Sequence, residues 1–229
     1  MQKTYTIRGI FYHLSGGDNL SVERTAIILA GGISSRLGQD KGLVRLAGKP
    51  LIKHVLDKVE SLVDERLVVV SSEDQTEQYM KELGSQTKVI VDKAEFHGPL
   101  GGAAAGFEKA RGKYSLLIAC DTPFASKDIL QLLLELSVNK NAVIPRWPNC
   151  CIEPLEAVYC TKPALEAARD GLRSGEVKMQ AMVNRLRNIR YVSTLVLEQL
   201  DPGLRTFFNV NTPLDLKKAE AMLKTPKAR

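Results

Sequence analysis

The sequence predicts an α/β fold, with a mostly parallel sheet that is covered by helices on both faces. Short apolar runs of strand length alternate with segments of helical periodicity along most of the 229 residues. Three of these apolar runs end at a glycine-rich loop or at an aspartate. Because ligands of such sheets bind beyond the carboxyl ends of the strands, the three run ends are expected to share one site.

The first half of the chain shows the alternation most clearly. Its predicted strands are separated by predicted helices, as parallel neighbours in a sheet require. The strands are residues 26–30 (AIILA), 67–71 (LVVVS), 88–91 (KVIV) and 115–119 (SLLIA). One predicted helix begins at Pro50, a second spans residues 74–83, and a third, rich in glycine and alanine, spans residues 98–110.

Beyond residue 145 the alternation becomes less regular. Predicted strands cover residues 142–145, 155–159 and 189–192, and predicted helices begin at Ser126, Pro163 and Met179, with Ser126 as a candidate cap. Near the end, Thr212-Pro213-Leu214-Asp215 supplies an N-cap residue, a first-turn proline and an acidic third position. The chain is therefore expected to end in a helix.

Composition limits the classes of function. With 44% hydrophobic and 25% charged residues, no apolar run near the ~18 residues of a membrane span, and no secretory signal, the sequence predicts a cytoplasmic protein without a membrane partner. The net charge of +6 is moderate, and only 6% of residues are aromatic, so nucleic acid is not an expected partner. The four cysteines lack metal-site spacing and are interpreted as free thiols, several of them buried.

The loop LAGGISSRLGQDKG, residues 29–42, has the composition of a phosphate-binding loop. It is not a Walker loop, since five residues separate Gly32 from Gly38 and Gln39 follows, and it lacks the dinucleotide-binding spacing. Gly31 and Gly32 expose backbone N–H groups to an anion. Arg36 and Lys41 add two cations, which suits a triphosphate better than a single phosphate.

Two aspartates follow predicted strands. Asp121, at the end of an apolar strand, is a candidate Mg²⁺ ligand, with a turn aspartate before Thr122-Pro123 as the alternative. Asp92 has the equivalent position on its own strand, and its alternative role is structural; either carboxylate can also accept hydrogen bonds from a ribose or a base. Asp40 is expected to position Lys41 rather than to bind metal.

Five blocks of sequence, in order, resemble the nucleotidyltransferases that include molybdenum cofactor guanylyltransferase. The resemblance runs from about Thr25 to Leu223, with mild departures at Leu37 and Gly101. The blocks are LAGGISSRLGQDKGL, GPLGGAAAG at 98–106, CDTPF at 120–124, EPLEAVY at 153–159 and FFNVNTPLDL at 207–216. The resemblance implies a Rossmann-like three-layer sandwich with a mixed, mainly parallel sheet.

The resemblance also implies roles for individual residues. Donor-nucleotide contacts are assigned to Leu29, Ala30, Gly31, Gly32, Lys41, Asp92 and Asp121, and catalytic roles to Arg36, Lys41 and Asp121. Asp121 is the implied ligand of Mg²⁺, the expected cofactor, and Asn209 and Asn211 are expected near the site. Residues 25–145 would bind the nucleotide and residues 146–224 the acceptor. Residues 1–24 form an N-terminal extension expected to be flexible, of which Met1 to Leu20 are expected to be dispensable for catalysis.

The implied reaction transfers GMP from GTP to the phosphate of molybdenum-molybdopterin, with transient contact to other molybdenum-cofactor proteins. Residues 162–190 hold seven basic and three acidic side chains, and Lys178, Arg185, Arg187 and Arg190 are expected to form an exposed cluster for the acceptor phosphate. Three alternatives remain open: CTP as the donor, another phosphate (of a sugar or an alcohol) as the acceptor, and a non-catalytic nucleotide-binding module.

Overall fold

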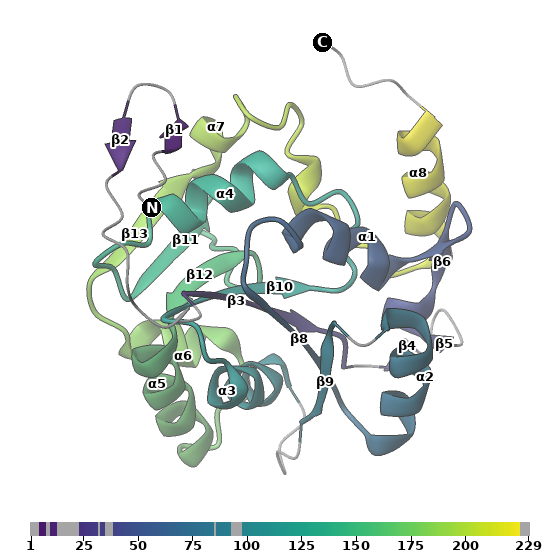
Figure 1. Cartoon of the computed structure of the whole chain (residues 1–229), viewed down its shortest axis with the longest axis horizontal. Helices are drawn as coiled ribbons and strands as arrows, with labels where there is room; N and C mark the ends of the chain where they lie inside the picture. Colours follow the sequence, from purple (N-terminus) through teal and green to yellow (C-terminus); the bar gives the residue numbers. More distant parts are fainter. Residues whose placement is uncertain are drawn as a thin grey trace.

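A seven-stranded sheet forms the centre of the computed structural model, which describes residues 5–7, 10–12, 23–31, 33–34, 39–84, 86–92 and 98–224 (Figure 1). The strand order is β13-β11-β12-β10-β3-β8-β9. Neighbouring strands are parallel, except that β12 runs antiparallel to both β10 and β11. The expectation of a mixed, mainly parallel sheet is confirmed.

Each run that the sequence predicts as a strand takes part in this sheet. The strands are β3 (Arg24–Leu29), β8 (Glu65–Val70), β9 (Lys88–Val91), β10 (Tyr114–Ala119), β11 (Ala142–Arg146), β12 (Ala157–Cys160) and β13 (Ile189–Ser193). Three strand starts differ from the prediction by two residues, since β3 and β8 begin two residues earlier and β12 begins two residues later. Residues 153–156 form a turn instead, closed by the N–H of Glu156, which donates to the carbonyl of Glu153 at 3.4 Å.

Helices cover both faces of the sheet and complete three layers (Figure 1). One hydrophobic core lies between the sheet and α1 and α4, and a second lies between the sheet and α3, α5 and α6. Successive strand residues alternate between them, as Ile27 and Ile28 do. The helices are α1 (Leu51–Val59), α2 (Glu73–Leu83), α3 (Pro99–Lys109), α4 (Lys127–Glu135), α5 (Thr161–Arg173), α6 (Met179–Arg185), α7 (Thr194–Leu197) and α8 (Pro213–Lys224).

The remaining elements are short and lie outside the central sheet. They are β1 (Tyr5–Ile7), β2 (Ile10–Tyr12), β4 (Ile33–Ser34), β5 (Gln39–Asp40), β6 (Arg45–Leu46), β7 (Lys49–Pro50), η1 (Lys41–Leu43) and η2 (Arg205–Phe207). Strands β1 and β2 pair with each other in an antiparallel hairpin that is separate from the central sheet. The main sheet therefore begins at β3, close to the predicted domain start at residue 25.

The sequence predicts a capping residue at the start of two helices, and the structure confirms one of them. The predicted signal at α8 is confirmed, because Thr212 Oγ1 accepts from the N–H of Asp215 at 3.1 Å and Asp215 Oδ2 accepts from the N–H of Thr212 at 3.0 Å. Ser126 does precede α4, but the prediction that its side chain caps the helix is wrong. The N–H of Ser126 instead donates to Thr206 Oγ1 at 3.0 Å, which fastens this turn to η2.

The small residues of α3 let this helix lie close against β3. A Cβ atom on Gly106 would collide with Ile27, and one on Gly102 would lie 3.5 Å from Leu29 Cδ2. Glycine is unfavourable inside a helix by about 1 kcal/mol relative to alanine. The close approach of helix and strand explains why glycine is found at position 106, whereas the space at Gly102 would admit a Cβ atom.

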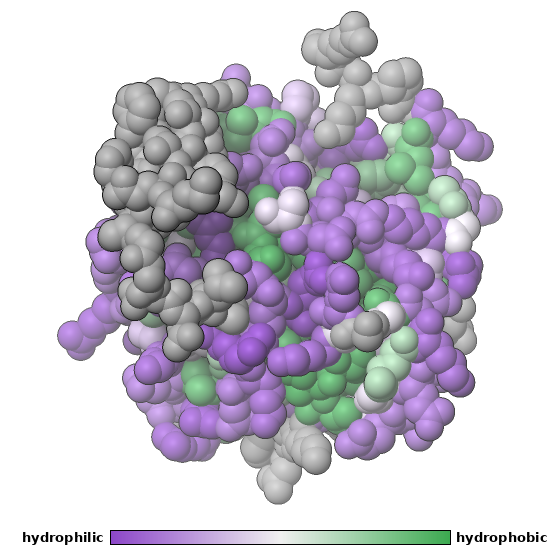
Figure 2. All heavy atoms as spheres, in the orientation of Figure 1, coloured by the Kyte–Doolittle hydropathy of each residue, from purple (hydrophilic) through white to green (hydrophobic). Residues whose placement is uncertain are grey.

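Hydrophilic residues predominate on the face shown in Figure 2, with hydrophobic residues visible between them. Within the described part of the chain, no helix combines the length and the apolar character that crossing a bilayer requires. This agrees with the absence of a membrane-spanning run from the sequence.

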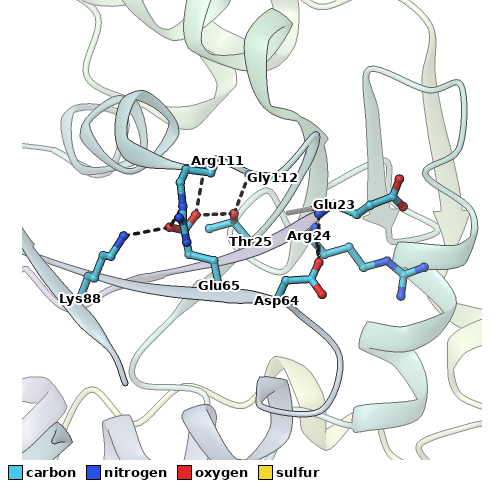
Figure 3. A network of polar contacts seen from close by, with 8 residues as sticks. All are labelled: Glu23, Arg24, Thr25, Asp64, Glu65, Lys88, Arg111 and Gly112. Atoms are coloured by element: carbon cyan, nitrogen blue, oxygen red, sulfur yellow. Dashed lines mark hydrogen bonds and ion pairs between the residues drawn. The ribbon is translucent and has the colours of Figure 1, made fainter. Parts of the chain in front are cut away.

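A buried carboxylate joins several strands at the amino edge of the sheet (Figure 3). Glu65, whose side chain is 3% exposed, accepts from Thr25 Oγ1 at 2.9 Å and from both the backbone and Nε of Arg111 at 2.9 and 2.7 Å. Lys88 Nζ lies 3.3 Å from the same carboxylate. Burial opposes the charge of Glu65, but these hydrogen bonds outweigh burial and hold its pKa below the usual value.

Replacing Glu65 with glutamine is expected to lower the free energy of unfolding by about 1–3 kcal/mol at pH 7, because the amide lacks the charge and presents a donor to other donors. Urea unfolding measures this loss. A carboxylate with a lowered folded-state pKa stabilises fully above its unfolded pKa of about 4.3 and loses its contribution as pH falls through the folded pKa. The difference between wild type and Glu65→Gln should therefore shrink below about pH 4.

The matched control is Glu60→Gln, which breaks a surface ion pair with Arg66 at a side chain that is 64% exposed. This variant should unfold within about 0.5 kcal/mol of wild type. Equal effects of the two substitutions would contradict the role of the Glu65 network.

A truncated protein that begins at Ser21 is expected to fold and to keep its activity. It retains Glu23 and Arg24, whose N–H groups each donate to Asp64 Oδ2 at 3.0 Å and tie the start of β3 to β8. Among the described residues it loses only β1 and β2, which lie outside the central sheet, and isolated hairpins contribute little stability. Thermal unfolding checks this prediction, and a truncated protein that cannot fold would place the extension in the core.

Candidate functional site

The loops after β3, β9 and β10 meet at the carboxyl edge of the sheet. Backbone hydrogen bonds continue the sheet past its strand ends, since the N–H of Ala30 donates to Val69 at 2.8 Å and that of Asp92 donates to Val70 at 2.7 Å. Because β3 and β8 lie between β10 and β9, the glycine loop begins between Asp121 and Asp92. The expected meeting of these three features at one edge is confirmed.

The start of the glycine loop lies tightly against the neighbouring strand end. Residues 29–31 leave β3, and a Cβ atom on Gly31 would collide with the hydroxyl of Ser71, which follows β8. Only a glycine fits there without a shift of Ser71. Gly32 and Arg36 lie outside the described residues, so their roles stay predictions.

Lys41 joins the end of the glycine loop to the aspartate of β10. Its ammonium donates to Asp121 Oδ2 at 2.6 Å and to Asn211 Oδ1 at 2.5 Å. The Asp121 side chain is 10% exposed and that of Lys41 is 25% exposed, so water screens this ion pair less than a surface pair. The contact brings together three segments that are distant in the sequence.

The second oxygen of Asp121 has different surroundings. Oδ1 is buried and has no hydrogen-bond partner among the residues that the structure describes. The backbone carbonyl of Asp121 accepts from the N–H of Val210 at 2.9 Å, which holds the flanking Asn209 and Asn211 beside the site. The expectation that these asparagines lie near the site is confirmed.

A cavity of about 520 Å³ opens next to Asp121. Its walls combine apolar side chains with amides and three carboxyl groups, and Lys178 is the one basic side chain among the described residues that line it. The lining residues are Pro99, Ala119, Asp121, Cys151, Ile152, Glu153, Pro154, Leu155, Glu156, Lys178, Met179, Gln180, Asn209 and Asn211. Apolar walls with a small number of polar groups are typical of a site for a small molecule.

Asp92 lines a separate cavity of about 560 Å³, between β9 and α3. The floor is apolar, formed by residues 89–91 together with Ala104 and Ala105. Asp92 Oδ2 lies 3.8 Å from the position of a Cβ atom on Gly102, so helix and carboxylate are close. The nucleotide contact that the resemblance implies for Asp92 stays a prediction.

Glu156 is a residue of the first cavity that the sequence analysis does not single out. It is buried just before β12, and burial, followed by the charges of Glu153 and Asp121, raises the pKa of its carboxyl well above the usual value. The available signal is an acidic side chain next to the apolar run of residues 157–159. A buried neutral carboxyl adds a hydrogen-bonding group to the cavity without adding negative charge.

The predicted cluster of four basic residues does not form. Lys178 lies at the cavity, but Arg185 is paired with Glu176 at 2.8 Å. Arg190 donates to a carbonyl at the end of α4 at 3.3 Å, and both Arg187 and Arg190 lie at the amino edge of the sheet, opposite the site. The prediction fails because β13 runs parallel to β11 and so begins at the far edge.

The role expected for Asp40, to position Lys41 rather than to bind metal, stays a prediction. Asp40 makes no direct contact with Lys41 among the described interactions, and its carboxylate instead accepts from Gly42 N–H at 3.0 Å and from the side chains of Gln75 and Tyr79. Any influence on Lys41 therefore passes through the backbone. The two contacts from α2 join residues 35 and 39 positions apart, beyond the reach of local patterns.

All four cysteines are free, as predicted, but only Cys120 is buried. Burial and then the neighbouring Asp121 raise the pKa of the Cys120 thiol, so it packs as a neutral group. Cys150 and Cys151 are exposed in the turn between β11 and β12. Among the described residues, no group of three or more His, Cys, Asp or Glu side chains is arranged to hold a metal.

The fold and this edge of the sheet, where the glycine loop begins beside the strand that carries Asp121 and a cavity opens next to that carboxylate, are those expected of a nucleotidyltransferase. The chain belongs to the family of MobA-like NTP transferase domains, whose sequence model matches residues 26–189.

Known relatives resemble the chain over most of its length. It is 34% identical over 201 residues to a "Probable molybdenum cofactor guanylyltransferase" of Methanosarcina mazei, with 85% of this chain and 88% of the relative covered. It is also 34% identical over 202 residues to the molybdenum cofactor guanylyltransferase of Desulfosudis oleivorans, with 87% and 96% covered. The crystal structure of molybdopterin-guanine dinucleotide biosynthesis protein A from Archaeoglobus fulgidus matches with a TM-score of 0.75 and 29% identity, covering 87% of this chain and 98% of that chain.

Proposed function

We propose that this protein transfers GMP from GTP to the terminal phosphate of molybdenum-molybdopterin, which yields molybdopterin guanine dinucleotide and pyrophosphate. The observation that carries the proposal is the divided carboxylate of Asp121, with one oxygen on Lys41 and the other buried and without a described partner at a second-substrate cavity. The names of the relatives support guanine nucleotide as the donor and the molybdenum cofactor as the acceptor.

In this reaction an oxygen of the acceptor phosphate attacks the α-phosphorus of GTP. The bond from the α-phosphorus to the bridging oxygen breaks, and pyrophosphate leaves. The task of the protein is to align the two phosphates and to offset their charge. The N–H of Gly31 and the ammonium of Lys41 are proposed to meet the donor phosphates, and Arg36 is proposed to assist them.

Asp121 is suited to Mg²⁺. The ion is usually held in proteins by one or two carboxylates together with substrate phosphates, rather than by a cage of side chains. Oδ1 of Asp121 supplies such an oxygen without disturbing the pair that Oδ2 forms with Lys41. When bound, Mg²⁺ would neutralise charge on the donor phosphates.

The acceptor is proposed to occupy the cavity beside Asp121. Apolar walls from Ile152, Leu155 and Met179 suit the flat pterin, and Lys178 offers a cation for its phosphate. Asp92, at the other cavity, is proposed to accept hydrogen bonds from the donor nucleoside. Cytoplasmic location and contact with other molybdenum-cofactor proteins stay predictions.

Pyrophosphate release tests the proposed function directly. The protein would be incubated with Mg²⁺, molybdenum-molybdopterin and either GTP, CTP or ATP, and the dinucleotide would be identified by mass spectrometry. We expect pyrophosphate release with GTP and none with CTP or ATP. Release only with CTP would change the donor, and a protein that binds nucleotide without any release would be a binding module.

Asp121→Asn is expected to reduce Mg²⁺-dependent pyrophosphate release by at least ~100-fold while the protein stays folded, because an amide is a poor Mg²⁺ ligand and a weak partner for Lys41. Asp128→Asn makes the same chemical change at an exposed position in the first turn of α4 and should keep wild-type activity. Near-normal turnover of Asp121→Asn would remove this residue from the reaction.

Lys178→Glu is expected to raise the KM for the acceptor about tenfold or more and to leave the affinity for GTP within about twofold, because only the acceptor phosphate would meet this side chain. Steady-state kinetics at two salt concentrations measures both values. Arg190→Glu is the control, since this arginine lies at the opposite edge of the sheet. If both variants behave like wild type, Lys178 belongs to the ordinary surface.

A further inference from the structure

Both described ends of the glycine loop contact α2 or the turn that precedes it. At the first end, Gly31 lies against Ser71, where any larger side chain would collide. At the second end, a Cβ atom on Gly42 would collide with the phenol oxygen of Tyr79. The loop is therefore fitted to this helix at two places.

Asp40 is the centre of the second contact. Its carboxylate accepts from the hydroxyl of Tyr79, from the amide of Gln75 and from the N–H of Gly42, the last at 3.0 Å. Tyr79 is fully buried, and its hydroxyl also lies 3.4 Å from the carbonyl oxygen of Ala30. One phenol thus reaches both the start and the end of the loop.

Gln75 connects the two ends in a different way. Its Oε1 accepts from the N–H of Ser71 at 2.7 Å and from that of Ser72 at 3.2 Å, while its Nε2 donates to Asp40. The same amide therefore caps α2 and holds the carboxylate that precedes Lys41. Only 8% of Gln75 is exposed, so its side chain has little freedom to turn away.

These contacts lead to the reaction site through the backbone. Asp40 is the N-cap residue of η1, and Lys41 is the first residue of this helical turn. From there the Lys41 ammonium reaches Asp121 and Asn211. A shift of the backbone at Asp40 would move the base of the lysine side chain directly.

We propose that Gln75 and Tyr79, which we call the α2 clamp, are positioning residues that act through Asp40 to set the place of Lys41. This inference rests on the proposed function, in which Lys41 meets the donor phosphates. Displacements of about 1 Å in a reacting site can cost on the order of 100-fold in rate. A flexible lysine side chain depends on a fixed backbone to avoid such a displacement.

The test is Tyr79→Phe, which keeps the ring in the core and removes only the hydroxyl. It is expected to lower kcat/KM for the donor nucleotide about tenfold or more, with the acceptor KM within about twofold of wild type. The matched control is Tyr114→Phe, a buried tyrosine whose hydroxyl accepts from the N–H of Asn139 at 3.0 Å at the amino edge. Equal kinetics of the two variants would overturn the proposal.

A double-mutant cycle separates positioning from a general loss of structure. If Tyr79 acts through Lys41, adding Tyr79→Phe to Lys41→Ala should slow the enzyme no further than Lys41→Ala alone. An undiminished effect of Tyr79→Phe in the Lys41→Ala background would overturn the assignment. Thermal unfolding of each variant shows whether the protein remains folded during the assays.

Affinity for the donor nucleotide, measured by calorimetry without acceptor, distinguishes failure of this inference from failure of the proposed function. If wild type binds GTP or another triphosphate but does not turn over, the proposed acceptor is wrong, and weaker binding by Tyr79→Phe than by Tyr114→Phe still supports the α2 clamp. Equal binding by these variants overturns the α2 clamp alone. A wild-type protein that binds no triphosphate overturns both.

Discussion

The candidate site depends on one carboxylate whose two oxygens meet different surroundings. Asp121 follows the central strand β10, and its side chain is only 10% exposed. One oxygen is held by Lys41 from the glycine loop, and the other is buried without a described partner. An unpaired buried carboxylate oxygen is unfavourable in the protein alone, so the arrangement favours a cation or a donor from outside. The glycine loop reaches this carboxylate through Lys41, the asparagines flank Val210, which is bonded to the backbone of Asp121, and the cavity opens beside it.

The two edges of the sheet handle buried charge in opposite ways. At the amino edge, Glu65 receives hydrogen bonds from Thr25, Arg111 and Lys88, and both of its oxygens are occupied. At the carboxyl edge, Asp121 keeps one oxygen open. The first arrangement stabilises the packing of β3, β8 and β9, and the second provides a binding site. Parallel strands make this division natural, since every loop after a strand emerges on the same edge.

The basic residues of the segment 162–190 are close together in the sequence but are not clustered in the structure. The helices α5 and α6 and the strand β13 carry these residues to both edges of the sheet, and acidic neighbours pair with several of them. Lys178 alone of the four proposed acceptor residues lines the cavity. The acceptor site thus depends on one lysine among apolar walls and amides rather than on a basic surface.

The sequence by itself determined the alternation of strands and helices, the glycine loop and the aspartates at strand ends. These features follow from local periodicity and from the rule that parallel strands end at one edge, so they need no knowledge of distant contacts. The tertiary structure alone decided which groups meet there. Lys41 pairs with Asp121 and Asn211, which lie 80 and 170 positions away. Asp40 accepts hydrogen bonds from Gln75 and Tyr79, which lie 35 and 39 positions away. Such partners depend on how whole helices and loops dock on the sheet, and docking is set by the packing of the complete core.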